Sequence, residues 1–228
     1  MSLLEARDVH KVYASRGVET LALRGVDFRM EAGEFSALAG PSGSGKTTLL
    51  NLCGALDSPT RGSLRLDGDT FADLSPAGLA SMRLHKLGFV FQAYNLIPVL
   101  SARENVEFVM ELQGVRRADR SARAAELLGA VGLADLADKR PPEMSGGQQQ
   151  RVAVARAIAS RPLLVLADEP TANLDSASAG QLLDLMEQLN REHGITFLFS
   201  THDPRVLEKA RRRILLRDGR IEADERRD

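Results

Sequence analysis

The chain has only one cysteine, Cys53, among its 228 residues. A single cysteine excludes an internal disulfide framework and a cysteine-ligated metal cluster, and we expect Cys53 to be a small buried residue of a helix. A large charge of either sign is also missing, because 30 basic and 31 acidic side chains leave a formal net charge of -1. This balance gives no overall attraction to nucleic acid, so we expect no nucleic-acid partner.

Long apolar runs are missing as well. No window approaches the ~18 to 20 apolar residues that a membrane span requires, and residues 1–13 carry charges without the apolar core of a leader sequence. We therefore expect a chain that neither crosses a membrane by itself nor is secreted. Its 43 % of hydrophobic residues are enough for one large core, or for a core and a smaller lobe.

The most informative segment that is present reads GPSGSGKTT. It fits the P-loop pattern, in which backbone N–H groups cradle phosphates, a lysine reaches the β- and γ-phosphates and a hydroxyl binds Mg²⁺. The preceding apolar run GEFSALAG and the following helix formers LLNLCGAL supply the strand and helix that such a loop needs. The pattern predicts a nucleoside triphosphate and Mg²⁺ bound by Gly40, Pro41, Ser42, Gly43, Ser44, Gly45, Lys46, Thr47 and Thr48.

The distribution of turn residues and helix formers predicts an α/β fold. Short segments near 2–9, 22–30, 34–39 and 63–70 read as strands, and the stretch 93–143 reads as a helical insert. Helices and buried strands then alternate to the end of the chain, which predicts a mostly parallel sheet covered on both faces. The basic run Arg211–Arg213 is expected on a solvated strand edge.

Two adjacent carboxylates, Asp168 and Glu169, end the buried strand LLVLADEP. In a P-loop fold this strand end faces the nucleotide, so Asp168 is expected to hold Mg²⁺ through its hydration shell. Glu169 would polarise an attacking water near the γ-phosphate. Without the P-loop, the same pair could simply end a strand in solvent.

The segment SGGQ supplies a hydroxyl and glycine N–H groups at the start of a predicted helix. It is a second anion-binding device, although such a segment is often only a helix-capping turn. One chain has a single lysine-bearing loop, so we expect this device to close over the nucleotide of a second copy in a symmetric pair. The residues concerned are Ser145, Gly146, Gly147 and Gln148.

Taken together, GPSGSGKTT, Gln92, MSGGQQQR, LLVLADEP, NLD and STHD resemble the ATPase domains of ABC transporters in their order and spacing. The resemblance covers nearly the whole chain and is greatest to the group of macrolide-export, lipoprotein-release and cell-division ATPases. It implies a P-loop ABC ATPase fold with an N-terminal antiparallel β subdomain. The nucleotide-binding core and this β subdomain would take residues 1–92 and 146–228, and a helical subdomain would take residues 93–145.

The resemblance also implies roles for four further residues. Tyr13 would stack on adenine, Gln92 would sense Mg²⁺ and water while facing the transporter, and His202 would contact the γ-phosphate. Asp175 would lie in the loop that carries information across the nucleotide sandwich. Each has a simpler alternative: a half-buried strand residue for Tyr13, a polar strand end for Gln92, a capped or surface histidine for His202 and a helix cap for Asp175.

Three departures from the common pattern leave the chemistry intact. Met144 replaces a leucine, Ala172 replaces a glycine, and Thr47 replaces a serine while keeping its hydroxyl. The resemblance therefore implies an ATPase in which Glu169, His202, Lys46 and Gln92 act on ATP.

The partners implied by the resemblance are a second copy of the chain and an integral membrane permease of four spans with a large extracytoplasmic domain. This places the chain at the cytoplasmic face of the inner membrane, driving export, lipid or lipoprotein extraction, or mechanical signalling. Three other roles stay open: an importer ATPase, a regulator that signals to cell-wall enzymes, and an ABC ATPase acting on DNA or ribosomes.

Overall fold

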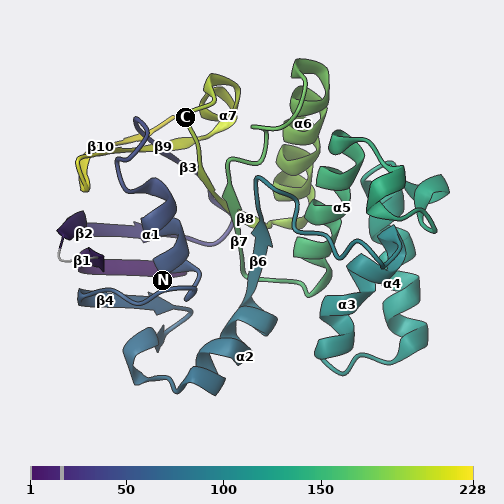
Figure 1. Cartoon of the computed structure of the whole chain (residues 1–228), viewed down its shortest axis with the longest axis horizontal. Helices are drawn as coiled ribbons and strands as arrows, with labels where there is room; N and C mark the ends of the chain where they lie inside the picture. The colour runs from purple at the N-terminus through teal and green to yellow at the C-terminus, as the bar shows by residue number, and fades with distance from the viewer. Residues whose placement is uncertain (1, 16–17, 228) are drawn as a thin grey trace.

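The computed structural model describes residues 2–15 and 18–227, and its strands form two sheets (Figure 1). The first is a four-stranded antiparallel sheet in the order β2-β1-β4-β5. β2 and β4 end on alternating buried and exposed residues, as expected for a sheet with one face in solvent. The four strands are β1 (Leu4–Ser15), β2 (Val18–Met30), β4 (Arg61–Leu66) and β5 (Asp69–Thr70).

The second sheet has six strands in the order β10-β9-β3-β8-β7-β6. Only its β9–β10 hairpin is antiparallel, and β3 is paired in parallel with both β8 and β9. All five residues of β3 are buried, because helices or the other sheet cover both faces of this strand. Its strands are β3 (Phe35–Ala39), β6 (Leu87–Val90), β7 (Leu164–Asp168), β8 (Thr196–Ser200), β9 (Arg212–Arg217) and β10 (Arg220–Arg226).

The helices begin at residues that satisfy free backbone N–H groups. Ser101 forms a capping box with Glu104, and Asp175 accepts two N–H bonds at the start of the longest helix. Figure 1 shows α3 and α4 on the side of the six-stranded sheet away from the first sheet. The helices are α1 (Lys46–Cys53), α2 (Pro76–Lys86), α3 (Ala102–Leu112), α4 (Arg117–Ala130), α5 (Gly146–Ala159), α6 (Ser176–His193) and α7 (Pro204–Lys209).

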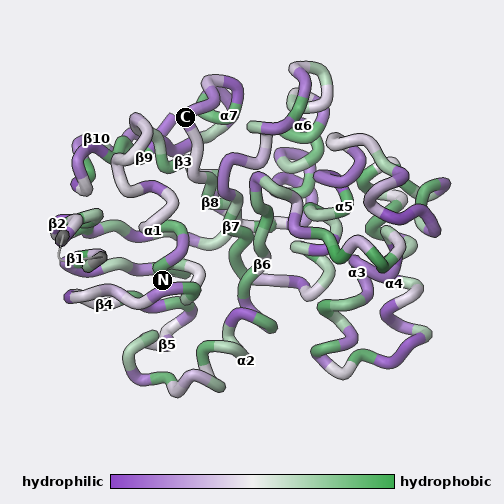
Figure 2. Tube along the Cα trace, viewed as in Figure 1, coloured by the Kyte–Doolittle hydropathy of each residue, from purple (hydrophilic) through white to green (hydrophobic). Residues whose placement is uncertain are grey.

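Two hydrophobic cores lie on the two faces of the six-stranded sheet, and β7 shows how they are divided. Leu164 and Leu166 belong to the core shared with α1 and the antiparallel sheet, whereas Val165 and Ala167 belong to the core shared with α3 to α6. This is the period of two expected of a strand buried on both faces. Figure 2 shows the hydrophobic residues concentrated along β6, β7 and β8 in the middle of the molecule. None of the helices in the described residues has both the length and the apolar character needed to cross a bilayer.

The expected α/β architecture is confirmed, although several predicted strand bounds and elements differ. β1 and β2 run on as a ribbon beyond the predicted segments 2–9 and 22–30, and the segment 63–70 is divided by a turn into β4 and β5. The sequence predicts neither α2 nor β6. The four residues of β6 follow directly on α2, so that no turn residue separates the two elements. Cys53 is buried in α1, as expected.

At Arg212 the expectation of a solvated strand edge is wrong. β9 lies between β3 and β10, and Arg212 is only 6 % exposed. Its guanidinium donates to Glu34 at 2.8 Å and to both carboxylate oxygens of Asp224 at 2.7 and 2.8 Å. Because three arginines follow one another, the sequence does not show the alternation of buried and less buried positions in β9. This alternation turns the Arg212 side chain inward.

We predict that Arg212→Ala lowers the free energy of unfolding by about 3 kcal/mol, because it leaves Glu34 and Asp224 without their shared cation. Urea unfolding followed by circular dichroism measures the change. Arg217→Ala is the matched control on the same strand, because its contact with Glu222 is 3.5 Å long and its side chain is 63 % exposed. Equal losses of stability in the two variants would contradict the structural role of Arg212.

Candidate functional site

The loop between β3 and α1 is packed so closely that two of its positions accept only glycine. Gly40 has φ +146°, and a Cβ built on it would lie 2.1 Å from the Leu216 carbonyl oxygen. Gly45 has φ +102°, and its Cβ would lie 2.7 Å from the Ala22 carbonyl oxygen. The conformation and the lack of space both exclude a side chain. The predicted P-loop is therefore present, with α1 beginning at Lys46 as expected.

Lys46 is turned back into the loop. Its side chain is buried, and its ammonium donates to the carbonyl oxygens of Gly40 at 2.8 Å and of Pro41 at 2.9 Å. No side chain caps the first turn of α1, because the N-cap residue is Gly45. The free N–H groups of that turn and the Lys46 cation therefore face the same place, an arrangement suited to phosphate.

Thr47 and Asp168 bring two side-chain oxygens together at the end of β7. The Thr47 hydroxyl on α1 donates to Asp168 Oδ1 at the end of β7, at 3.1 Å. A hydroxyl and a carboxylate are donors that a hard cation accepts, and Mg²⁺ commonly takes its remaining ligands from phosphates and water. The described residues contain no group of three or more histidine, cysteine, aspartate or glutamate side chains able to hold a metal alone. The hydroxyl of Thr47 and the carboxylate of Asp168 are suited to a hard cation that takes its other ligands from phosphate and water.

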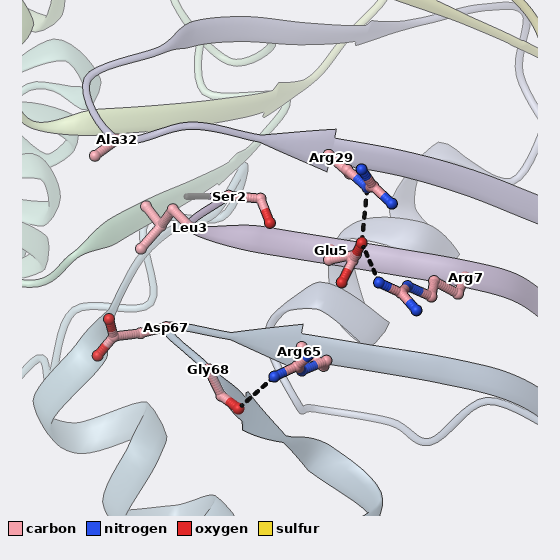
Figure 3. Close-up of a pocket in the computed structure, with 9 residues that line it drawn as sticks. All are labelled: Ser2, Leu3, Glu5, Arg7, Arg29, Ala32, Arg65, Asp67 and Gly68. Carbon is pink, nitrogen blue, oxygen red and sulfur yellow. Dashed lines mark hydrogen bonds and ion pairs between the residues drawn. The ribbon is translucent and has the colours of Figure 1, made fainter.

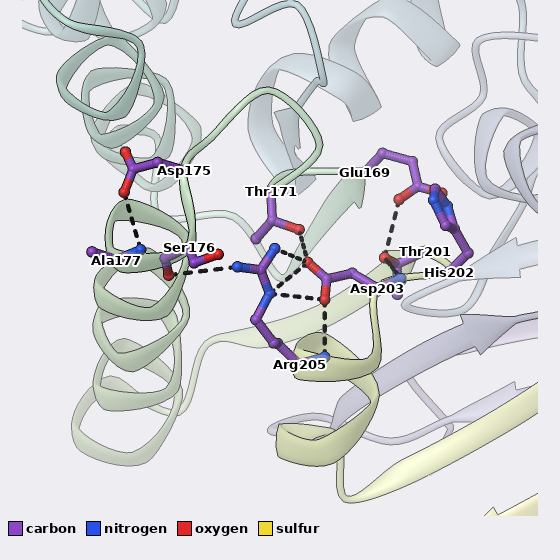
Figure 4. Close-up of polar contacts among 9 residues, drawn as sticks. All are labelled: Glu169, Thr171, Asp175, Ser176, Ala177, Thr201, His202, Asp203 and Arg205. Atoms are coloured by element: carbon purple, nitrogen blue, oxygen red, sulfur yellow. Dashed lines mark hydrogen bonds and ion pairs between the residues drawn. The ribbon is translucent and has the colours of Figure 1, made fainter.

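Glu169 follows β7 in a left-handed conformation, with φ +45°, and its backbone N–H donates to the Ser200 carbonyl. The carboxylate of Glu169 is held by the two residues that follow β8. Thr201 Oγ1 donates to one oxygen at 3.1 Å, and His202 Nδ1 lies 2.7 Å from the other (Figure 4). This geometry requires the His202 proton to be on Nδ1 if His202 is the donor.

Gln92, Glu169 and His202 meet the P-loop around one cleft of about 580 Å³. Thr20, Leu21 and Ala22 of β2 form another part of its lining. The cleft therefore unites residues from β2, the P-loop and the ends of β6, β7 and β8. Most of the predicted phosphate-facing residues line it, namely Pro41, Ser42, Gly43, Gly45, Lys46, Thr47 and Thr48, together with Gln92, Glu169 and His202.

The other predicted site residues do not line this cleft. Ser145 and Gln148 close a capping box on each other at the start of α5, and Asp175 caps α6 through the N–H groups of Ala177 and Ser178. The hydrogen bond with Ser178 and those with the nearby backbone lower the pKa of Asp175. Tyr13 lies on β1, 40 % exposed, and its hydroxyl donates to Asp57 at 3.0 Å.

Gln150 is a residue of the site region to which the sequence analysis assigns no role. It is fully buried in α5, and its amide nitrogen donates to the carbonyls of Phe91 at 3.3 Å and of Pro170 at 2.8 Å. These two carbonyls precede Gln92 and follow Glu169. Gln150 thereby fixes the separation of two segments that border the cleft. The partners are 59 and 20 residues away, so no local spacing could have indicated the contact.

Asp203 is a second such residue. Burial alone would raise the pKa of its carboxyl group, but hydrogen bonds from Arg205 and Thr171 outweigh that effect and lower the pKa to about 2. The Thr171 hydroxyl donates at 2.6 Å, and the Arg205 guanidinium binds the carboxylate with two nitrogens. Asp203 therefore joins the segment after Glu169 to the segment after His202.

A second cavity, of about 560 Å³, lies on the outer face of the antiparallel sheet (Figure 3). There the Glu5 carboxylate binds Arg29 at 2.7 Å and Arg7 at 2.9 Å, and Arg65 donates to the Gly68 carbonyl. These arginines satisfy acceptors of the sheet itself. The cavity contains none of the predicted site residues.

Known proteins resemble this chain over nearly its whole length. The family described as ABC transporter matches residues 23–172. The ATP-binding protein LolD 1 of the lipoprotein-releasing system of Caulobacter vibrioides is 47 % identical over 99 % of this chain and 97 % of its own length. The macrolide export ATP-binding/permease protein MacB of Syntrophobacter fumaroxidans is 46 % identical, and this chain spans only 32 % of its length.

A solved structure of the ATP-binding cassette MJ0796, a dimer bound to ADP and Pi, is 41 % identical, with a TM-score of 0.90 and 98 % of both chains covered. The chain belongs to the ABC transporter family. Its fold is that of the ATP-binding cassette, and the activity of its class is ATP hydrolysis.

We predict that Lys46→Ala weakens ATP binding by about 10- to 100-fold, because the variant loses a charge-assisted contact with phosphate. Equilibrium titration with a fluorescent ATP analogue, displaced by ATP, measures the affinity. Lys139→Ala is the control, since this half-exposed lysine pairs with Glu143 away from the cleft. An unchanged ATP affinity in Lys46→Ala would exclude the P-loop role of Lys46.

We predict that Asp203→Asn lowers the free energy of unfolding at pH 7 by about 2 kcal/mol, because the pKa of about 2 lies below that of an unfolded aspartate. A depressed carboxyl pKa stabilises the fold above the unfolded pKa, and this stability is lost as the pH falls through the folded pKa. The difference between parent and variant should therefore narrow below about pH 4. Urea unfolding between pH 7 and pH 3 measures it. Asp119→Asn, at an exposed position, serves as control. If the difference in the free energy of unfolding between parent and Asp203→Asn does not change with pH, the charge of Asp203 does not stabilise the fold.

Proposed function

We propose that two copies of the chain bind two molecules of MgATP between them and that hydrolysis drives a separate membrane permease. The work done would be export, extraction of lipid or lipoprotein, or mechanical signalling across the envelope. The named functions of the relatives, lipoprotein release and macrolide export, support this range. The observation that carries the proposal is the placement of the Glu169 carboxylate at the cleft that also contains Lys46 and His202.

In this mechanism the chain's own groups bind, orient and move a proton. Lys46 exchanges its two carbonyl partners for phosphate oxygens, and the N–H groups at the start of α1 take others. Glu169 orients a water molecule toward the γ-phosphate and accepts its proton, while His202 steadies the transferring group. When bound, Mg²⁺ supplies positive charge against the phosphates, and Thr47, Asp168 and Gln92 are the residues that would hold it or its water.

The proposed dimer gives a role to residues that stand away from the chain's own cleft. Ser145 and Gly146 begin α5, where free N–H groups and the helix dipole favour an anion. Since they do not line the cleft of their own chain, the nucleotide of a second copy is the phosphate available to them. The dimeric cassette bound to ADP and Pi supports this arrangement. Asp175, which caps α6, would lie between the two nucleotides, and Tyr13 would contact adenine.

The partner in the membrane is proposed to dock at Gln92 and the helical region of residues 93–145. α3 and α4 occupy this region, and Asn173 Nδ2 donates to the Gln92 carbonyl at 2.9 Å. A movement of Gln92 would thus reach the segment that follows Glu169. We propose a permease of four spans with a large extracytoplasmic domain, and hence a location at the cytoplasmic face of the inner membrane.

We predict that Glu169→Gln lowers steady-state ATP hydrolysis at least ~100-fold while ATP binding persists, because the variant keeps the shape of the site and loses its base. A phosphate-release assay measures turnover, and gel filtration with MgATP should show the variant as a dimer. Glu208→Gln, exposed on α7, is the control. Steady-state hydrolysis at the parent's rate would refute the role of Glu169.

The same variant tests the partner when it is purified from membranes in MgATP and its companions are identified by mass spectrometry. A four-span permease that stimulates the parent's ATPase activity supports the proposal. Recovery of a permease that works with a substrate-binding protein would instead indicate import. Recovery of ribosomes or DNA without a membrane protein would overturn the proposed role.

A further inference from the structure

The two oxygens of the Glu169 carboxylate are held by very different partners. Oε1 contacts His202, whose side chain is 74 % exposed, whereas Oε2 accepts from Thr201, which is fully buried. The exposed imidazole is free to turn toward a nucleotide, as its proposed role requires. The buried hydroxyl is not, so it is the contact that still orients the carboxylate once His202 has turned away.

The direction of the Thr201 hydroxyl is determined by its surroundings. Its oxygen accepts the backbone N–H of Asp203 at 2.9 Å, which leaves its single proton for Glu169 Oε2 at 3.1 Å. Glu169 Oε2 accepts this proton, so the two bonds reinforce one arrangement. Thr201 therefore presents a donor of fixed direction to the base.

Asp203 in turn fixes the position of the N–H group that Thr201 accepts. Its side chain, 11 % exposed, accepts from Thr171 at 2.6 Å and from Arg205 at 2.7 and 3.0 Å, and it caps α7 through the Arg205 N–H at 2.9 Å (Figure 4). Arg205 also lies 3.5 Å from the Ser176 carbonyl, at the start of α6. The loop that carries Thr201 and His202 is thus anchored on its far side by charge-assisted bonds.

We propose that Thr201 and Asp203 are positioning residues that keep the Glu169 carboxylate aligned for hydrolysis when His202 turns to the γ-phosphate. The inference rests on the proposed function of Glu169 and extends it to two residues that do not line the cleft. They act through Glu169 and not on ATP. Their loss should lower kcat and leave the KM for ATP nearly unchanged.

The test compares Thr201→Val with Thr201→Ser in the full chain. Valine keeps the shape and removes the hydroxyl, so kcat should fall by about 10- to 100-fold, the cost of a misplaced catalytic group, while KM changes less than about threefold. Serine restores the hydroxyl and should recover most of kcat. Thr171→Val, which removes the 2.6 Å bond to Asp203, should lower kcat in the same direction by a smaller factor.

A double-mutant cycle separates positioning from a general structural effect. In the Glu169→Gln background, Thr201→Val should leave the residual rate unchanged, because the carboxylate that it positions is already gone. If Thr201→Val lowers the residual ATPase rate of Glu169→Gln by the same factor as it lowers the parent's rate, the inference is overturned. Parent-like kcat in Thr201→Val, or a fall in kcat that serine does not restore, would also overturn it.

If the unmodified chain, which serves as the reference, hydrolyses no ATP, the proposed function itself fails. A normal rate in the parent together with an unaffected Thr201→Val removes only the positioning role.

Discussion

The nucleotide cleft depends on how closely the P-loop lies against the C-terminal hairpin and β2. A Cβ on Gly40 would lie 2.1 Å from the Leu216 carbonyl oxygen, and the Gly219 N–H donates to the Ser44 carbonyl at 3.1 Å. Arg24 N–H then donates to the Gly219 carbonyl at 2.8 Å. The hairpin turn therefore joins the P-loop to the antiparallel sheet, so that both sheets determine the shape of one anion-binding loop. Every other site residue is placed relative to this loop.

The groups proposed to bind the nucleotide and its cation are bonded to the protein itself in this structure. Lys46 donates to two carbonyls of its own loop, Thr47 donates to Asp168, and Ser145 accepts the Gln148 N–H. A nucleotide or a second copy has to replace these bonds with better ones. The affinity for a nucleotide is then a difference between two sets of hydrogen bonds, and a highly charged ligand gains more from the exchange than a neutral one.

The sequence predicts those parts of the site that depend on neighbours along the chain. The P-loop, the carboxylates after β7 and the cap of α5 each need particular residue types at short spacing, and the structure has all three. Gln150, Asp203 and Arg212 are not predicted, because each has a partner far along the chain: Pro170, Thr171 and Glu34 lie 20, 32 and 178 residues away. The fold follows the same division. Strongly alternating strands and capped helices are predictable, whereas β6 and α2 follow one another without a turn residue to separate them.

The position of β3 in the central sheet has a consequence for synthesis of the chain. β3 ends at Ala39, yet its hydrogen-bonded neighbours are β8, which begins at Thr196, and β9, which ends at Arg217. Glu34, just before β3, likewise forms its ion pair with Arg212 only after β9 has been synthesised. β3, which leads into the P-loop, therefore stays unpaired within its sheet until β8 and β9 have been synthesised. Truncation before β8 would therefore leave β3, which leads into the P-loop, without either of its hydrogen-bonded neighbours.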